Sequence, residues 1–153
     1  MRRWIQSLVP IALIFGCLGL CLTCTTPDSP PRQPAARDGV FLHISSGPES
    51  PHRVLMALKM AELMAEDRDV LVYFDIKGIE VVLVDAPDIE HPAFPSSHDQ
   101  IEKLLDRGVP LYACPGCLQA AGKGPEDLRT GIRVADKDAF FDFTDGRILT
   151  LDY

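Results

Sequence analysis

The amino-acid sequence predicts a three-layer α/β domain, in which a mainly parallel central sheet lies between helices. Three observations lead to this prediction. Short apolar runs rich in β-branched residues alternate with stretches whose apolar residues recur at helical spacing. The run from Asp69 to Asp75 (DVLVYFD) is apolar between its ends, as in a strand covered on both faces. Alternating strands and helices imply parallel strands joined by right-handed crossovers.

The first 24 residues have the pattern of a targeting segment rather than of a folded element. Arg2 and Arg3 precede a nearly uninterrupted apolar run from Ile5 to Leu22, as in an export signal. About eighteen apolar residues also suffice for a retained membrane anchor. Under both interpretations we expect export, to the periplasm or the cell envelope, with the leader attaching the protein to the membrane.

Three cysteines near the end of this run indicate lipid attachment. Bacterial lipoproteins are cleaved just before a cysteine that then carries the lipid. Cys17 has the better preceding residues, Ile14 and Gly16, whereas Cys24 has the better polar context after it, and Cys21 lies between them. We expect one of the three to be lipidated, with a retained helix or ordinary cleavage as the alternative.

Residues 25–38 are rich in proline and should form an extended tether, and residues 39–153 should form one folded domain. Without Arg2 and Arg3, 13 basic residues remain against 22 acidic residues, a formal charge of −9. Such a surface repels phosphate backbones, so we expect no nucleic-acid partner.

The folded domain should begin with a strand and a long helix. Val40 to Ser45 (VFLHIS) is apolar and is closed by the turn residues of SSGPESP. Ser50 is a suitable N-cap, and Pro51 suits the first helical position. Apolar residues at helical spacing then extend the helix to Glu66, and the strand at residues 69–75 follows.

The middle of the domain contains one ambiguous segment and a second strand–helix unit. Residues 79–86 (IEVVLVDA) fit either a strand or a short helix. After a proline-rich loop, Ser97 should cap a helix from His98 to Arg107, which Gly108 ends. Residues 109–113 (VPLYA) should form the next buried strand.

The last third of the domain should add a helix from CLQAAG and three shorter elements. These are a strand at residues 131–135, a short helix at residues 136–144 and a final strand at residues 147–151. In open parallel sheets, sites collect outside the carboxyl ends of the strands. One such end is followed directly by Cys114.

Cys114 and Cys117 are the candidate catalytic residues. If the strand ends at Ala113 and the helix begins at Pro115, Cys114 is the N-cap and Cys117 lies in the first turn. Unpaired backbone N–H groups and the helix dipole there favour a thiolate over a thiol. This placement lowers the pKa of a cysteine and makes it nucleophilic.

Several roles are compatible with this spacing. Cys114 can attack or carry sulfur as a persulfide with Cys117 as its partner, or the pair can cycle between dithiol and disulfide. A static disulfide and an inert packed pair also fit. A zinc site lacks a second cysteine pair or a histidine pair, so no metal and no cofactor is expected.

Other polar residues fit ordinary structural roles. His43 lies within a strand and is expected to be a packed core histidine. His52, His91 and His98 are expected to be solvated rather than ligands. Asp75, at the end of the central strand, is expected to be a capping or turn carboxylate, with a place in the cleft beside the thiols as the alternative.

The segments HISSGPES, VLVYFDIKGIEVV, IEKLLDRGVPLYACPGCLQAAG and RILTLDY together resemble the DsrE/DsrF-like sulfur-relay family. The resemblance covers most of the chain from Val40 onward, and its most specific point is the cysteine after GVPLYA, which is Cys114. It implies a flavodoxin-like sheet, assembly into homotrimers, homohexamers or related hetero-oligomers, and a persulfide carried on Cys114. Relay members are typically cytoplasmic and do not require Cys117, so we expect this chain to be an exported, C-P-G-C-containing member that departs from their pattern in both respects.

Two functions follow as hypotheses. The first is a membrane-tethered or exported protein that handles sulfur or thiol redox equivalents through Cys114, with Cys117 as partner thiol and another protein as sulfur donor or acceptor. Such a protein is a carrier more than a turnover enzyme. The alternative is a non-catalytic oligomeric module that binds a small ligand and contains a structural Cys114–Cys117 disulfide.

Overall fold

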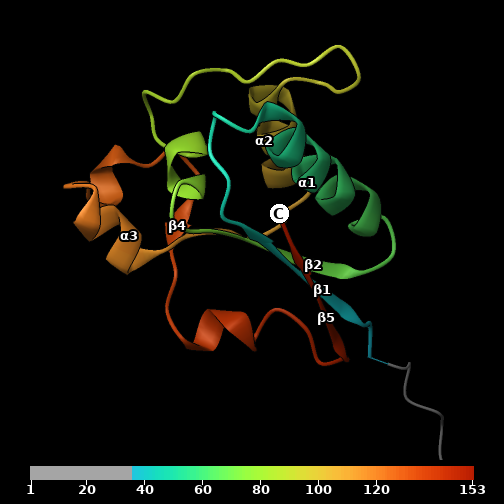
Figure 1. Ribbon diagram of the computed structural model, residues 1–153. Coiled ribbons are helices and arrows are strands. Elements are labelled where there is room, and N and C mark those ends of the chain that lie inside the picture. The colour runs from blue at the N-terminus through green and yellow to red at the C-terminus, as the bar shows by residue number, and fades with distance from the viewer. Residues whose placement is uncertain (1–35) are drawn as a thin grey trace, which may run out of the picture. The chain divides into compact units, whose positions relative to one another are not determined.

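The structure, a computed structural model, describes residues 36–153 and is built on a five-stranded sheet (Figure 1). The strand order is β4-β3-β2-β1-β5, and every neighbouring pair is parallel. This confirms the predicted α/β fold class. The strands are β1 (Gly39–Ile44), β2 (Asp69–Phe74), β3 (Leu111–Ala113), β4 (Arg133–Val134) and β5 (Ile148–Asp152).

The helical elements divide unequally between the two faces of the sheet. Helices α1 (Pro51–Met64) and α2 (Ser97–Asp106) lie together over one face, and α3 (Pro115–Ala120) follows β3 (Figure 1). Between β4 and β5 the chain crosses to the other edge of the sheet along the opposite face, through the short 3₁₀-helix η3 (Asp138–Phe140). One face is therefore covered by full helices and the other by a short connection.

The alternation of side chains along β1 and β2 separates a buried core from this less covered face. Leu42 and Ile44 of β1 and Phe74 of β2 are fully buried within the core that α1 and α2 complete. Phe41 and Tyr73 point the opposite way, where their rings contact that of Phe140 at 5.6 and 5.0 Å between centroids. Because successive strand residues face opposite sides, the next residue of this second set on β1 is His43.

The ambiguous segment at residues 79–86 forms no strand of the sheet. It begins as the 3₁₀-helix η1 (Gly78–Val81), and an isolated antiparallel bridge joins Leu83 to Leu128. Ile79, Val81 and Val82 are buried, so burial explains the β-branched residues that favoured a strand. A short apolar run fits a buried turn as well as it fits a strand.

The helix predicted to start at His98 begins one residue earlier, and its cap is a different serine. Ser96 has extended backbone angles, and its Oγ accepts a hydrogen bond from the Asp99 backbone N–H at 3.3 Å. Ser97 is the first helical residue and is completely buried. Of two adjacent serines, the one that remains extended becomes the cap.

The remaining boundaries differ by a few residues from those expected. Helix α1 ends at Met64 rather than Glu66, the strand β4 has two residues, and the predicted helix at residues 136–144 contracts to η3. The predicted leader at residues 1–24, its candidate lipidation sites and most of the tether lie outside the described residues. Among residues 36–153, no helix has both the length and the apolar character needed to cross a bilayer.

Candidate functional site

The candidate site lies at the carboxyl ends of the parallel strands, where their register aligns polar side chains. His43 on β1 pairs with Asp152 on β5 and with Tyr73 on β2. Aligned residues of neighbouring parallel strands share a face, so these three side chains form a row on the less covered face. Cys114 directly follows β3, the strand on the other side of β2, and its backbone N–H donates to the Phe74 carbonyl at 2.8 Å. This bond places Cys114 directly beyond the end of β3 and beside β2.

Cys114 is the N-cap of α3, as the sequence predicts. Its backbone is extended, and its Sγ accepts a hydrogen bond from the Cys117 backbone N–H at 3.2 Å. Pro115 occupies the first helical position, where a missing N–H leaves no carbonyl unpaired. The cysteine thus replaces the hydroxyl or carboxylate usually found at a helix N-cap.

The second sulfur receives its contact from the turn after β2. The backbone N–H of Ile76 donates to Cys117 Sγ at 3.1 Å. Ile76 has a φ of 46°, a left-handed conformation that is sterically unfavourable for a β-branched residue. Both cysteines are free thiols and partly exposed. The C-P-G-C segment and the β2 turn therefore meet at the thiols.

The two thiols differ in their ionisation. Burial raises the pKa of Cys114, but hydrogen bonds from Cys117, from Tyr73 and from backbone N–H groups outweigh it, so the pKa lies below its ordinary value. For Cys117, burial and the hydrogen bond to Cys114 raise the pKa despite the Ile76 N–H. The two pKa shifts have opposite directions, so Cys114 ionises more readily than Cys117.

Tyr73 connects this pair to the row of polar side chains. Its hydroxyl interacts with Cys114, and burial together with that interaction raises the pKa of Tyr73 far above its ordinary range. The phenol therefore stays protonated and serves as a donor. The His43 ring stacks on the Tyr73 ring at 5.8 Å between centroids and 27° between planes.

His43 is not the packed core histidine that its position in a strand indicated. It lies on the less covered face, its side chain is 27% exposed, and a carboxylate contacts each ring nitrogen. Nε2 lies 2.8 Å from Asp75 Oδ2, and Nδ1 lies 2.8 Å from Asp152 Oδ1. Burial lowers the pKa of His43, but its bonds to Asp75 and Asp152 raise it further, and the net shift is upward.

Asp75 also differs from the capping or turn role expected for it. Its backbone carbonyl does accept from the Gly78 N–H in the turn, but its carboxylate contacts His43. It also directly precedes Ile76, whose N–H contacts the Cys117 sulfur. The carboxylate of Asp75 therefore faces His43, and its charge acts on the nearby Cys117 thiol.

Sequence reasoning identified the cysteines but not Tyr73, His43 or Asp152 as their surroundings. The alternation of side chains between the two faces of each strand could have indicated these residues. His43 and Tyr73 are polar residues near the ends of two apolar strands, and both fall on the side opposite the helix-covered core. Asp152 is the last residue of the final strand, at the same edge of the sheet.

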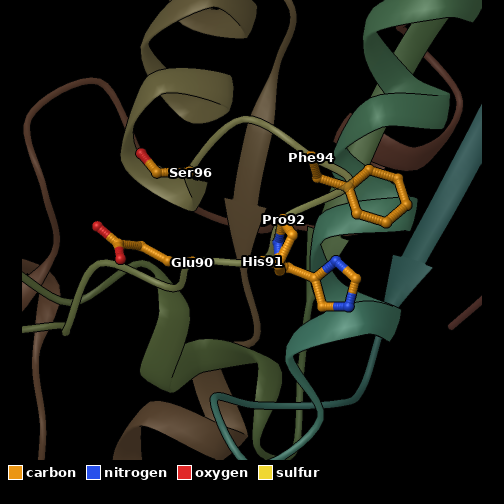
Figure 2. A pocket seen from close by; sticks show the side chains of 5 residues that line it. All are labelled: Glu90, His91, Pro92, Phe94 and Ser96. Carbon is orange, nitrogen blue, oxygen red and sulfur yellow. The ribbon is translucent and has the colours of Figure 1, made fainter.

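A separate cavity of about 550 Å³ lies in the proline-rich loop, lined by Glu90, His91, Pro92, Phe94 and Ser96 (Figure 2). The His91 and Phe94 rings point toward α1, where His52 stacks on His91 at 5.1 Å between centroids. His91 is thus partly packed against His52 and Phe94 and remains partly exposed. The two thiols are not among the residues that line this cavity.

The described part of the chain, residues 36–153, contains no group of three His, Cys, Asp or Glu side chains placed to hold a metal ion. Several polar groups of the site contact one another. Each nitrogen of His43 is matched by a carboxylate, and each sulfur accepts a backbone N–H. The arrangement is suited to holding a reactive thiolate.

Known proteins share this fold. The structure is similar to the YchN protein of E. coli, with a TM-score of 0.54 and 15% identity over 75% of this chain and 99% of that one. It is also similar to MTH1491, a protein of unknown function from Methanobacterium thermoautotrophicum, with a TM-score of 0.50, 20% identity and the same coverage. At these identities the two structures support the fold.

Sequence comparison extends the relationship. The chain is 22% identical over 108 residues to the uncharacterized protein MJ0760 of Methanocaldococcus jannaschii. The match covers 69% of this chain but only 39% of that relative. The family model described as DsrE/DsrF-like family matches residues 38–146, which include the whole candidate site except Asp152. The chain therefore belongs to the DsrE/DsrF-like family.

Proposed function

We propose that this protein carries sulfur or thiol redox equivalents on Cys114, with Cys117 as its partner thiol. The DsrE/DsrF-like family is generally related to sulfur relay. The observation that carries the proposal is the surroundings of Cys114 Sγ, which accepts a hydrogen bond from the Cys117 backbone N–H at 3.2 Å and interacts with Tyr73. Such bonds favour the nucleophilic thiolate.

The chemistry requires only the two thiols and a sulfane-sulfur donor. The Cys114 thiolate attacks the outer sulfur of a polysulfide, a new S–S bond forms, and the shortened polysulfide leaves with the electron pair of the broken bond. An acceptor protein's thiolate then attacks the outer sulfur of the Cys114 persulfide and releases the Cys114 thiolate. If Cys117 attacks Cys114 Sγ instead, hydrosulfide leaves and a Cys114–Cys117 disulfide forms.

The cellular setting is part of the same proposal. The charged and apolar pattern of residues 1–24 supports export and attachment to the membrane, through a lipidated cysteine or a retained helix. Exposed apolar residues on the edge strand β5, Ile148 and Leu149, support assembly into a homotrimer or homohexamer. A donor or acceptor protein would deliver or remove the sulfur.

Mass spectrometry of the polysulfide-treated protein tests the proposal. We expect one adduct of ~32 Da, one sulfur atom, on the peptide that contains Cys114, and its loss after reduction. Peptide mapping separates this adduct from any adduct on Cys17, Cys21 or Cys24. Cys114→Ser should abolish the adduct in that peptide. Cys117→Ser, the matched control, should retain it for longer because no neighbouring thiol can displace hydrosulfide.

Two results would contradict the proposal. An adduct confined to the leader cysteines would mean that Cys114 is not a sulfur acceptor. A Cys114–Cys117 pair that is oxidised as isolated, resists mild reductant and reacts with no alkylating agent would favour the alternative, a non-catalytic module with a structural disulfide.

A further inference from the structure

The thiol pair faces four ionisable side chains from three strands or their ends. Tyr73 on β2 interacts with Cys114, and Asp75, just after β2, precedes the residue whose N–H contacts the Cys117 sulfur. His43 on β1 stacks on Tyr73 and contacts Asp75, and Asp152 on β5 contacts the far side of His43. The role of Cys114 as carrier uses only the first of these contacts.

The charges in this set act on the thiols in opposite directions. A carboxylate next to a thiolate opposes ionisation, and Asp75 raises the pKa of Cys117, after burial and Cys114 itself. When His43 is protonated, its imidazolium lies 2.8 Å from that carboxylate and opposes the field of Asp75. Asp152 contacts the other ring nitrogen, which favours the protonated ring and fixes its orientation.

We propose that His43 is a positioning residue for the thiol pair: clamped between Asp75 and Asp152, it compensates the charge of Asp75 beside the thiols and holds Tyr73 against Cys114. The inference deepens the proposed function and rests on it, since it assigns a role around the same sulfur. His43 itself touches no reacting atom. Its two nitrogens are engaged by carboxylates, and Tyr73 lies between it and Cys114 in the network of contacts.

Charge compensation predicts that two substitutions within one contact act in opposite directions. His43→Gln keeps a hydrogen-bond donor but leaves Asp75 uncompensated, so the thiolate fraction at a given pH should fall. Asp75→Asn removes the negative charge beside the thiols, so the thiolate fraction should rise. A role in packing alone would predict the same direction for both, because both break the same contact.

The experiment measures the rate at which iodoacetamide alkylates Cys114 in the full chain, from about pH 5 to about pH 10, by peptide mass spectrometry. We expect the midpoint to rise in His43→Gln and to fall in Asp75→Asn. A half-unit shift changes the rate about threefold below the midpoint. The double variant should return close to the wild-type midpoint, and Tyr73→Phe should raise it through the lost hydrogen bond.

Two controls separate electrostatics from misfolding. At the alkaline plateau all thiols are ionised, so folded variants should differ from the wild type there only by the small change in thiolate nucleophilicity that accompanies a pKa shift. His98→Gln removes another carboxylate-contacting histidine, 3.9 Å from Asp88, and should leave the Cys114 profile unchanged. A strongly reduced plateau together with a loss of helical circular dichroism identifies an unfolded variant. In that case the midpoint of the double variant, compared with that of the wild type, tests the charge compensation.

The inference is overturned if His43→Gln and Asp75→Asn shift the midpoint in the same direction, or if neither shifts it. Alkylation requires no sulfur donor, so this outcome is distinguishable from failure of the proposed function. A normal set of midpoint shifts without any persulfide adduct would retain the role of His43 and reject sulfur carriage. A persulfide adduct with unshifted midpoints would retain sulfur carriage and reject the role of His43.

Discussion

At the scale of single residues, the site is a case in which backbone conformation supplies a donor to sulfur. Ile76 adopts a left-handed conformation, and its N–H points at Cys117 while its side chain is 65% exposed. β-Branched residues avoid this conformation because the Cβ approaches the following carbonyl. Unfavourable backbone geometry of this kind collects at functional sites, where surrounding contacts maintain it.

Ile76→Gly should therefore stabilise the protein relative to Ile76→Ala, although glycine normally destabilises. Glycine adopts φ of 46° without a steric penalty, whereas alanine retains the Cβ. The difference in the free energy of unfolding should be about 1 kcal/mol in favour of glycine, measured by urea denaturation. Equal stability of the two variants, or a more stable alanine variant, would show that the turn is not strained.

The raised pKa of His43 makes the stability of the fold depend on pH. The protonated ring is favoured in the folded state, because Asp75 and Asp152 outweigh the effect of burial. The contribution is fully present below the unfolded-state pKa of about 6.5 and is lost as the pH rises through the higher folded-state pKa. The stability advantage of wild type over His43→Gln should therefore shrink as the pH rises above about 6.5.

Urea denaturation of the two proteins at several pH values measures this difference directly. Thr150→Val, a change without an ionisable group on the neighbouring strand β5, should retain the wild-type pH dependence. A difference between wild type and His43→Gln that grows with pH would have the wrong sign and would contradict the assigned protonation of His43.

At the scale of elements, the sequence predicted most of what local patterns determine. The apolar run of β2, the helix after Pro51 and the N-cap position of Cys114 follow from periodicity and from the chemistry of helix ends. The interpretation of residues 79–86 was open, and that of His43 was wrong, because both depend on what lies across the sheet. Contacts between β1, β2 and β5 are not encoded in any one local pattern.

The roles of the two serines at the start of α2 also depend on their tertiary contacts rather than on the local sequence. Ser96 caps the helix at the surface, whereas the buried Ser97 accepts from the Ile89 N–H at 2.9 Å and donates to Asp88 at 3.1 Å. Ser96→Ala should cost about 1 kcal/mol, the usual loss for a cap. Ser97→Ala should cost about 2 kcal/mol, because it leaves a buried donor unpaired.

Chemical denaturation of both variants tests this order. Ser97→Thr, which retains the hydroxyl but adds a methyl group in a fully buried position, separates hydrogen bonding from packing. A larger loss for Ser96→Ala than for Ser97→Ala would mean that Ser97 is dispensable and that capping dominates at this helix start.

At the scale of the whole molecule, the sheet has one edge strand that remains exposed and apolar. β5 lies at the end of the strand order, and Leu149 is 54% exposed there, next to Ile148. Edge strands with exposed apolar side chains tend to associate unless charges or bulges protect them. This surface is consistent with the oligomer proposed for the protein.

The substitution Leu149→Lys should shift the protein toward smaller species if β5 lies in the subunit interface. We expect a trimer or hexamer for the wild type by native mass spectrometry and mainly monomer for the variant. Met56→Lys, at a partly exposed apolar residue on α1, is the matched control and should leave the assembly intact. A monomeric wild type would reject the proposed assembly.

The alternation along β1 and β2 has a consequence for engineering. Leu42 and Phe74 are buried in the core, and their immediate neighbours His43 and Tyr73 lie on the opposite face of the sheet, where Tyr73 interacts with Cys114. The strands β1 and β2 carry side chains on both faces of the sheet, so a backbone shift caused on the core face also moves the side chains on the opposite face. Substitutions that enlarge or shrink the interior at Leu42 should therefore retune the sulfur chemistry while the protein is still folded, which makes Cys114 a built-in reporter of core packing.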